Sequence, residues 1–343
     1  MSHPSQMSLP ESGATDRVLE LRGLKTYLFT EAGVVKAVDG VDLWVNRAEI
    51  LGVVGESGCG KSMMARSILR LLPPPGRIVA GEVLLDGQDL MKLSDSQMQS
   101  LRGDAIAMVF QEPMTSLDPV YTAGNQIEEV LVAHRPGMSR KERAERVVEL
   151  LRMVGIPSPE QRVNDYPHQL SGGMRQRVMI AIALACGSPR LLIADEPTTA
   201  LDVTIQAQIL ELFQRLQAEI RMSVMLITHD LGVVAETAER VAVMYAGSVV
   251  EYADVDTLFE NPRHPYTRGL LRALPQPGKD TRKGLLYTIP GVVPNLLDLP
   301  RGCRFFQRCP YGDVGLCLGA EPELELIEAG HSVRCSRVGD ILQ

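Results

Sequence analysis

The sequence predicts an α/β fold with a parallel sheet, an inserted helical subdomain and a small cysteine-rich C-terminal region. Three observations predict it: apolar runs that each end in polar residues, a glycine-rich loop between the first run and a helix, and four cysteines gathered near the C-terminus. Continuous apolar runs without alternation are typical of strands covered on both faces, as in parallel sheets. The four runs span residues 50–54, 106–110, 191–194 and 224–227.

Polar residues follow each of these predicted strands. A glycine-rich loop begins at Gly55, Gln111 follows the second run, Asp195 and Glu196 follow the third, and His229 comes soon after the fourth. Open parallel sheets bind their ligands at the carboxyl ends of their strands. We therefore expect these residues to form one site at one edge of the sheet.

Length, composition and charge limit the class of protein. With 343 residues the chain is long for a single core, so we expect two or three lobes. A formal net charge of −7 disfavours nucleic acid as a partner. No apolar run reaches the roughly 18–20 residues of a membrane helix. Residues 1–16 are polar, lack a hydrophobic signal core and are expected to form a flexible cytoplasmic tail.

The glycine-rich loop has the spacing of a nucleotide-binding phosphate loop. Between a strand and a helix, such a loop lets backbone N–H groups converge on phosphates, and the helix N-terminus adds partial positive charge. Lys61 is expected to reach the β- and γ-phosphates of ATP and Ser62 to ligate Mg²⁺. Cys59 is interpreted as a small filling residue. The predicted ATP-binding residues of the loop are Gly55, Glu56, Ser57, Gly58, Cys59, Gly60, Lys61 and Ser62.

Two carboxylates end the third predicted strand. Asp195 suits Mg²⁺, directly or through water. Glu196 would orient and deprotonate a water that attacks the phosphate. An acidic pair after a strand is also common in solvated turns and helix caps, and the pair alone favours that simpler interpretation.

A second motif precedes an apolar helix and reads Leu170-Ser171-Gly172-Gly173-Met174-Arg175-Gln176-Arg177. Together with the phosphate loop, it resembles the signature of the ATP-binding subunit of an ABC transporter. Met174 departs from the glutamine that this family usually has there. The resemblance implies that Ser171, Gly172 and Gly173 cap a nucleotide held by a second, identical or homologous ATPase subunit in a head-to-tail dimer.

The same resemblance assigns roles to further residues. Pro197 and residues 200–202 are similar to the family's D-loop, which favours catalysis at Glu196 and places Asp202 across the dimer seam. Gln111 matches the glutamine that senses Mg²⁺ and the γ-phosphate. His229 matches the switch histidine that contacts the γ-phosphate. The implied catalytic residues are therefore Glu196, His229 and Gln111, and the implied Mg²⁺ ligands are Ser62, Gln111 and Asp195.

Adenine stacks in this family on an aromatic residue near the first strand. The expected position falls nearest Leu28, so we expect Tyr27 or Phe29 to take that role.

The resemblance also divides the chain. It implies an ABC ATPase domain over residues 17–262, with a helical subdomain at about 112–170, and a C-terminal region over 263–343. Within the helical subdomain, Ser139 and Glu142 have the spacing of a capping box. The helix after them is expected to bury Val147, Leu150, Leu151 and Val154 on one face.

The motif Asn261-Pro262-Arg263-His264-Pro265-Tyr266-Thr267 resembles the C-terminal region of oligopeptide and dipeptide ABC importers, a branch that includes some nickel importers. It implies a peripheral ATPase at the cytoplasmic face of the cell inner membrane that powers peptide import. Its implied partners are two transmembrane permease subunits and, indirectly, a solute-binding protein, with no nucleic acid. The alternatives are an importer of nickel or another small solute and a soluble ABC ATPase not coupled to transport.

Four of the six cysteines lie in the C-terminal region: Cys303, Cys309, Cys317 and Cys335. In a cytosolic chain such clustering favours a metal over disulfides. The spacing lacks the paired cysteines of a zinc ribbon, and four thiolates on loops suit a [4Fe–4S] cluster equally well. The resemblance implies the cluster, because members of the branch carry one here; zinc and four free thiols are the alternatives. We also expect the cysteine site to be remote from Lys61 and Glu196, so that ATP binding by the isolated domain does not depend on it.

Overall fold

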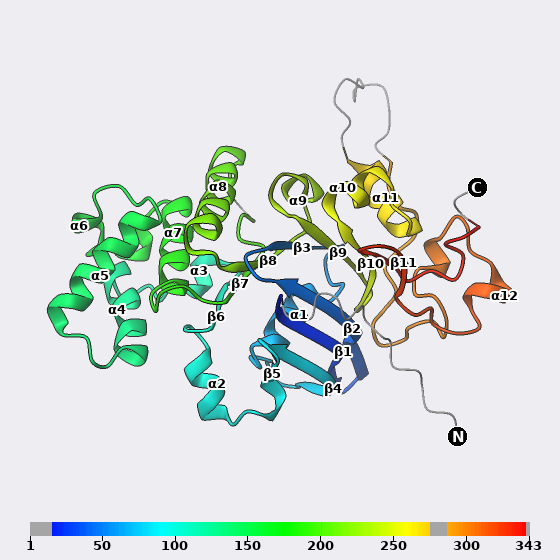
Figure 1. Cartoon of the computed structure of the whole chain (residues 1–343), viewed down its shortest axis with the longest axis horizontal. Helices are drawn as coiled ribbons and strands as arrows, with labels where there is room; N and C mark the ends of the chain where they lie inside the picture. Colours follow the sequence, from blue (N-terminus) through cyan, green and yellow to red (C-terminus); the bar gives the residue numbers. More distant parts are fainter. Residues whose placement is uncertain (1–15, 200, 275–286, 341–343) are drawn as a thin grey trace.

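The chain folds around two sheets, which a computed structural model describes for residues 16–199, 201–274 and 287–340. The predicted N-terminal tail, except Asp16, and Ala200 of the predicted D-loop lie outside the described residues. Figure 1 shows three parts in a row along the long axis. Green helices lie at one end, the sheets lie in the middle, and the orange and red C-terminal region lies at the other end.

The larger sheet contains the predicted parallel strands. Its order is β11-β12-β10-β9-β3-β8-β7-β6, and the five strands from β9 to β6 run parallel to one another. Both faces of these strands are covered, which accounts for their uninterrupted apolar sequences. The four strand predictions are confirmed. The five strands are β3 (Ile50–Val54), β6 (Ile106–Val109), β7 (Leu191–Asp195), β8 (Ser223–Thr228) and β9 (Arg240–Tyr245).

The C-terminal region extends this sheet. Strand β10 pairs antiparallel with β9, and β12 then pairs antiparallel with β10. The last strands therefore join the sheet that carries the phosphate loop. The bounds are β10 (Ser248–Asp254), β11 (Glu325–Glu328) and β12 (His331–Val333).

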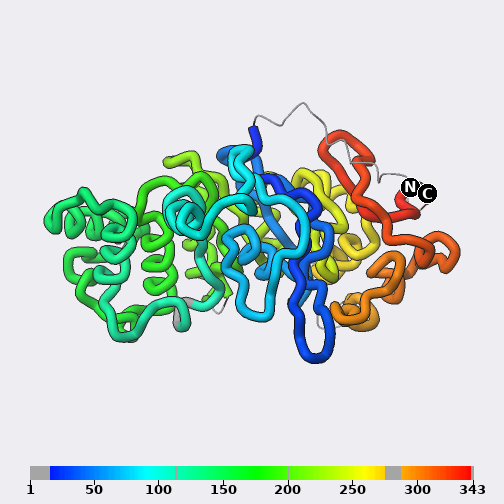
Figure 2. The backbone as a smooth tube through the Cα atoms, turned by 90° about the horizontal axis from the view of Figure 1, so that it is seen from below, coloured from blue at the N-terminus to red at the C-terminus, as the bar shows by residue number. Residues whose placement is uncertain are grey.

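A second, four-stranded antiparallel sheet has the order β2-β1-β4-β5. Figure 2 shows its blue hairpin beside the orange segment of the C-terminal region, where the Lys36 N–H donates to the Leu296 carbonyl at 3.1 Å. The strands are β1 (Arg17–Thr30), β2 (Gly33–Asn46), β4 (Gly76–Leu85) and β5 (Gln88–Asp89).

Helices fill the segment between β6 and β7. The Ser139 side chain accepts from the Glu142 N–H while the Glu142 side chain accepts from the Ser139 N–H, so the predicted capping box is confirmed. The predicted apolar face of α5 is also confirmed, because Val147, Leu150 and Leu151 are at most 2% exposed. The helices of this segment are α3 (Pro113–Ser116), α4 (Ala123–His134), α5 (Arg140–Met153), α6 (Pro159–Arg162) and α7 (Gly172–Ala183), with the 3₁₀ turn η3 (Pro167–Gln169).

The remaining helices flank the sheets or belong to the C-terminal region. No helix of the described ranges is both long enough and apolar enough to cross a membrane. These helices are α1 (Lys61–Ile68), η2 (Leu90–Lys92), α2 (Asp95–Leu101), α8 (Val203–Ile220), α9 (Leu231–Thr237), α10 (Val255–Glu260), α11 (Pro265–Ala273), η4 (Phe306–Arg308) and α12 (Val314–Cys317).

A buried carboxylate on β10 holds the C-terminal region to the sheet. Glu251 is fully buried and accepts hydrogen bonds from the backbone N–H groups of Arg263 and His264, at 2.6 and 2.9 Å. Its third partner is the His331 ring, whose Nε2 lies 2.8 Å from a carboxylate oxygen. Removing one member of such a buried network leaves the others without partners.

We therefore expect Glu251→Ala to lower the free energy of unfolding by about 3 kcal/mol, as measured by denaturant titration. The matched control is Glu325→Ala, because Glu325 is exposed on β11, and we expect it to change stability by less than about 0.5 kcal/mol. Equal stability of the two variants would show that the Glu251 network does not hold this region.

Candidate functional site

The phosphate loop lies between β3 and α1, and its glycines are required by its shape. Gly60 has φ of 104°, and a Cβ there would lie 2.1 Å from the Ala37 carbonyl oxygen. At Gly55 a Cβ would lie 2.2 Å from the Met244 carbonyl oxygen. Backbone this close to the loop excludes any side chain at these two positions. Ser57 and Gly58 are exposed at the tip, whereas Cys59 is fully buried below it, as expected of a filling residue.

Lys61 is the first residue of α1 and is buried beneath the loop. Its ammonium donates to the carbonyl oxygens of Gly55 and Glu56, at 2.7 and 3.2 Å. The helix N-terminus and this ammonium give the loop positive character.

Two of the three predicted Mg²⁺ ligands, Ser62 and Asp195, meet across two elements, whereas the third, Gln111, donates to Glu196. The Ser62 hydroxyl, from α1, donates to Asp195 Oδ1 at the end of β7, at 3.0 Å. Two oxygen donors this close can ligate one hard cation, so the residues present fit the predicted ion. Burial raises the pKa of the Asp195 carboxyl, and the Ser62 hydrogen bond opposes that change. A bound cation would favour the ionised form.

Glu196 is the point on which the predicted catalytic groups converge. Its Oε2 accepts from Gln111 Nε2 at 3.1 Å and lies 3.4 Å from His229 Nδ1. These partners come from the ends of β6 and β8, the strands on either side of β7. Glu196 also has φ of 47°, a left-handed conformation that is unfavourable for a residue with a Cβ. Such conformations cluster at functional sites.

Sequence reasoning missed one residue of this group. The Thr199 hydroxyl donates to the same Oε2 atom at 2.9 Å and so helps to orient the carboxylate. Nothing in the sequence singles out Thr199, because its role depends on how the turn after β7 folds back.

The signature residues lie at the start of α7. Ser171 caps the helix, accepting from the Met174 N–H at 3.3 Å, and both Ser171 and Gly172 are exposed. Gly173 is buried against α8, where a Cβ would lie 2.6 Å from Ile205 Cγ2. Asp202 is exposed and caps α8. The exposed N-termini of α7 and α8 therefore lie side by side.

The predicted adenine-stacking residue lies on β1. The Tyr27 hydroxyl donates to Asp39 Oδ1 at 2.6 Å, and burial raises the pKa of that hydroxyl, with the Asp39 contact adding to the effect. Phe29, two residues on, is 45% exposed. The choice of Tyr27 for adenine stays a prediction.

The four C-terminal cysteines, Cys303, Cys309, Cys317 and Cys335, line one small pocket together with Phe305 and Phe306. Burial raises the pKa of the Cys303 thiol to about 12 and also raises the pKa values of Cys309 and Cys335. Within the described ranges, no three His, Cys, Asp or Glu side chains are arranged as a metal site. The iron–sulfur prediction thus has no support beyond the shared pocket of four thiols.

The C-terminal region does not lie away from the ATP site. Arg308, next to Cys309, forms two hydrogen bonds with the carboxylate of Glu56 in the phosphate loop, at 2.6 and 2.9 Å. A residue beside the cysteine site thus reaches the phosphate loop, whereas the expectation that the site itself is remote from Lys61 and Glu196 stays a prediction.

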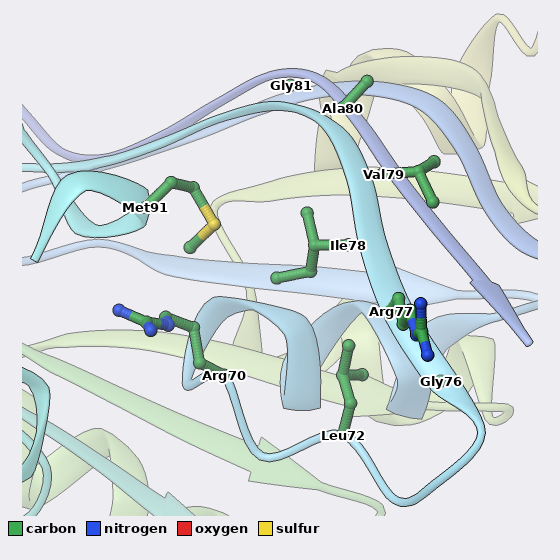
Figure 3. A pocket seen from close by; sticks show the side chains of 9 residues that line it. All are labelled: Arg70, Leu72, Gly76, Arg77, Ile78, Val79, Ala80, Gly81 and Met91. Atoms are coloured by element: carbon green, nitrogen blue, oxygen red, sulfur yellow. The ribbon is translucent and has the colours of Figure 1, made fainter. Parts of the chain in front are cut away.

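A hollow elsewhere on the protein is not this site. Figure 3 shows it between β4 and the carboxyl end of α1, lined by Arg70, Arg77, Ile78 and Met91 among others. The phosphate loop lies at the opposite, amino end of α1. We assign this hollow no role in nucleotide binding.

Family models match both parts of the chain. Residues 38–199 match the model described as "ABC transporter", and residues 250–317 match "Oligopeptide/dipeptide transporter, C-terminal region". Among solved structures, the chain resembles the dimeric post-hydrolysis state of the ATP-binding cassette MJ0796 bound to ADP and Pi. The TM-score is 0.62 and the identity 32%, covering 69% of this chain and 98% of that one.

Relatives match over nearly the whole length. A probable peptide ABC transporter ATP-binding protein of Sinorhizobium fredii is 52% identical, covering 98% of this chain and 99% of the relative. The oligopeptide transport ATP-binding protein AppD of Bacillus subtilis is 51% identical, and the dipeptide transport ATP-binding protein DppD of Escherichia coli is 48% identical. Each of these two alignments covers 93% of this chain and 96% of the relative.

The fold and the site thus define an ABC ATPase. The chain belongs to the family of ABC transporter ATP-binding proteins, in the group that carries the oligopeptide/dipeptide transporter C-terminal region.

Proposed function

We propose that this protein is the ATP-hydrolysing subunit that powers peptide import through a membrane ABC transporter. The observation that carries the proposal is that its similarity to ATP-binding proteins named for peptide, dipeptide or oligopeptide transport spans both the ATPase part and the C-terminal region. The protein would bind at the cytoplasmic face of the inner membrane to two permease subunits, and a solute-binding protein would deliver the peptide to them. The segment at about 112–170 would be the helical subdomain that contacts the permeases.

The chemistry would use the residues gathered at the four strand ends. Lys61 and the loop N–H groups would hold the phosphates of ATP, and Ser62 and Asp195 would hold Mg²⁺. When bound, the ion neutralises charge on the phosphates. Glu196 would take a proton from the attacking water, held in place by Gln111, Thr199 and His229. The convergence of three side chains on Glu196 Oε2 supports its role as the base.

The complete site would form between two subunits arranged head to tail. In support, Ser171 and Asp202 lie exposed at two helix starts, where free N–H groups favour an anion. A solved cassette that is similar to this chain is described as dimeric. The second subunit would be a copy of this chain or a homologous ATPase.

Deleting the gene in its native cells should abolish uptake of radiolabelled dipeptides and oligopeptides, and a plasmid copy should restore it. Nickel uptake, measured in the same cells, should not change. Loss of nickel uptake with normal peptide uptake would favour the small-solute alternative. Normal uptake of both would favour an ABC ATPase that is not coupled to transport.

We further propose that the four C-terminal cysteines hold a [4Fe–4S] cluster, with zinc as the alternative. The shared pocket and the all-thiol donor set support this assignment. Such a site would stabilise a loop-rich region that has little core of its own.

Purified without oxygen, the protein should be brown, absorb near about 400 nm and contain about four irons per chain. Cys309→Ser should remove the colour and the iron. Cys186→Ser should keep both, because Cys186 lies in the turn after α7 and does not line the pocket. A colourless protein with one zinc per chain would show that the site holds zinc instead of the cluster. A metal-free protein with four titratable thiols would contradict both assignments.

A further inference from the structure

Residues after position 263 hold Glu56, the second residue of the phosphate loop, at both its side chain and its backbone. The Arg308 guanidinium, 4% exposed, forms the paired contacts to the Glu56 carboxylate described above. The Tyr266 hydroxyl accepts from the Glu56 N–H at 3.0 Å. Tyr266 is fully buried and packs against Tyr245 and Phe305. The phosphate loop therefore contacts a buried aromatic cluster formed by Tyr266, Tyr245 and Phe305.

The charge of Glu56 explains why this contact matters for the nucleotide. A carboxylate in a loop that binds phosphates repels them unless a cation neutralises it. A bidentate guanidinium contact is the strongest neutralising contact that proteins use for a carboxylate. Lys61 does not serve this purpose, because its ammonium contacts the backbone carbonyls of Gly55 and Glu56.

We propose that Arg308 is a positioning residue for ATP, which neutralises Glu56 and holds the phosphate loop in its binding conformation. The proposal rests on the ATP site proposed above. It makes the C-terminal region part of the nucleotide site, and the loss of Arg308 should raise the KM for ATP more than it lowers kcat.

A second arginine of the same segment reaches the other side of the site. Arg304 donates to the Ala246 carbonyl at 2.6 Å and to Asp39 Oδ2 at 2.9 Å. Asp39 in turn accepts from Tyr27, the predicted adenine-stacking residue. Arg304 and Arg308 directly adjoin two cysteines of the thiol pocket, Cys303 and Cys309. The pocket is thereby linked to both sides of the nucleotide site.

The test is a charge-pair cycle on the full-length protein. Binding of the non-hydrolysable analogue adenylyl imidodiphosphate with Mg²⁺ is measured by calorimetry for wild type, R308M, R308K, E56Q and the double variant E56Q/R308M. We expect R308M to weaken binding about tenfold and R308K less than about threefold, because Lys retains the charge. E56Q changes a residue of the phosphate loop itself and completes the cycle, and it should bind the analogue more tightly than R308M does, because it leaves no unneutralised carboxylate beside the phosphates. The double variant should recover to within about threefold, because it has no carboxylate left to neutralise.

Two further variants keep the result interpretable. Y266F removes only the hydroxyl that accepts from Glu56, keeps the ring packing, and should weaken binding about threefold. R301M changes an exposed arginine of the same segment and should have no effect. Melting temperatures are measured for all variants, so that a general loss of folding is recognised.

Unchanged affinity in both R308M and Y266F would overturn the proposal, as would a double variant that binds no better than R308M. If R308M does not fold, the proposal depends on Y266F alone, and unchanged affinity there would overturn it. Failure of the ATP site itself would look different, because wild type would then not bind the analogue or Lys61→Ala would bind it normally.

Discussion

Glu196→Gln should leave ATP binding intact and lower kcat for hydrolysis at least about 100-fold. The amide keeps the size of the side chain but cannot accept a proton from water. The substitution leaves Lys61 and the loop that would hold the phosphates unchanged, so ATP should bind and remain bound. We therefore expect a nucleotide-bound dimer to accumulate, which gel filtration with ATP and Mg²⁺ would detect.

The control for this variant is Glu211→Gln, which removes an exposed carboxylate from α8 and should hydrolyse ATP at the wild-type rate. If Glu196→Gln turns over within a few-fold of wild type, the base is another residue, and the convergence of Gln111, Thr199 and His229 on Glu196 has a different purpose.

Lys61→Ala should weaken ATP binding about 100-fold, because the β- and γ-phosphates lose the charged group that the loop provides for them. Calorimetric titration of the full-length protein with ATP and Mg²⁺ measures this directly. Lys141→Ala, at an exposed lysine of α5, should bind as wild type does. Equal affinity of the two variants would refute the assignment of the phosphate loop.

The strands and the residues at their ends could be predicted because their signals are local. Continuous apolar runs arise from burial on both faces, and strands β3, β6, β7 and β8 lie within one or two residues of the predicted positions. Parallel strands then place their carboxyl ends at one edge, so Gln111, Glu196 and His229 had to meet. The capping box at Ser139 is also local, since its two hydrogen bonds span three residues.

The contacts of the C-terminal region could not be predicted in this way. Arg308 lies 252 residues from Glu56 in the chain, and one arginine between cysteines carries no signal about its partner. Tyr266 belongs to the motif that indicated the family. Nothing in that motif indicates that the Tyr266 hydroxyl contacts the phosphate loop. Long-range pairs of this kind depend on how whole segments pack, here on the strands β11 and β12 joining the main sheet.

The most direct test of the account is ATP-driven peptide uptake by right-side-out membrane vesicles from the native cells, loaded with ATP and Mg²⁺ and supplied with the solute-binding protein. Vesicles with the wild-type chain should accumulate labelled peptide only when ATP is inside. Vesicles with Glu196→Gln should contain the same amount of the protein and accumulate none. Equal uptake by the two kinds of vesicle would contradict the claim that hydrolysis at this site powers peptide import.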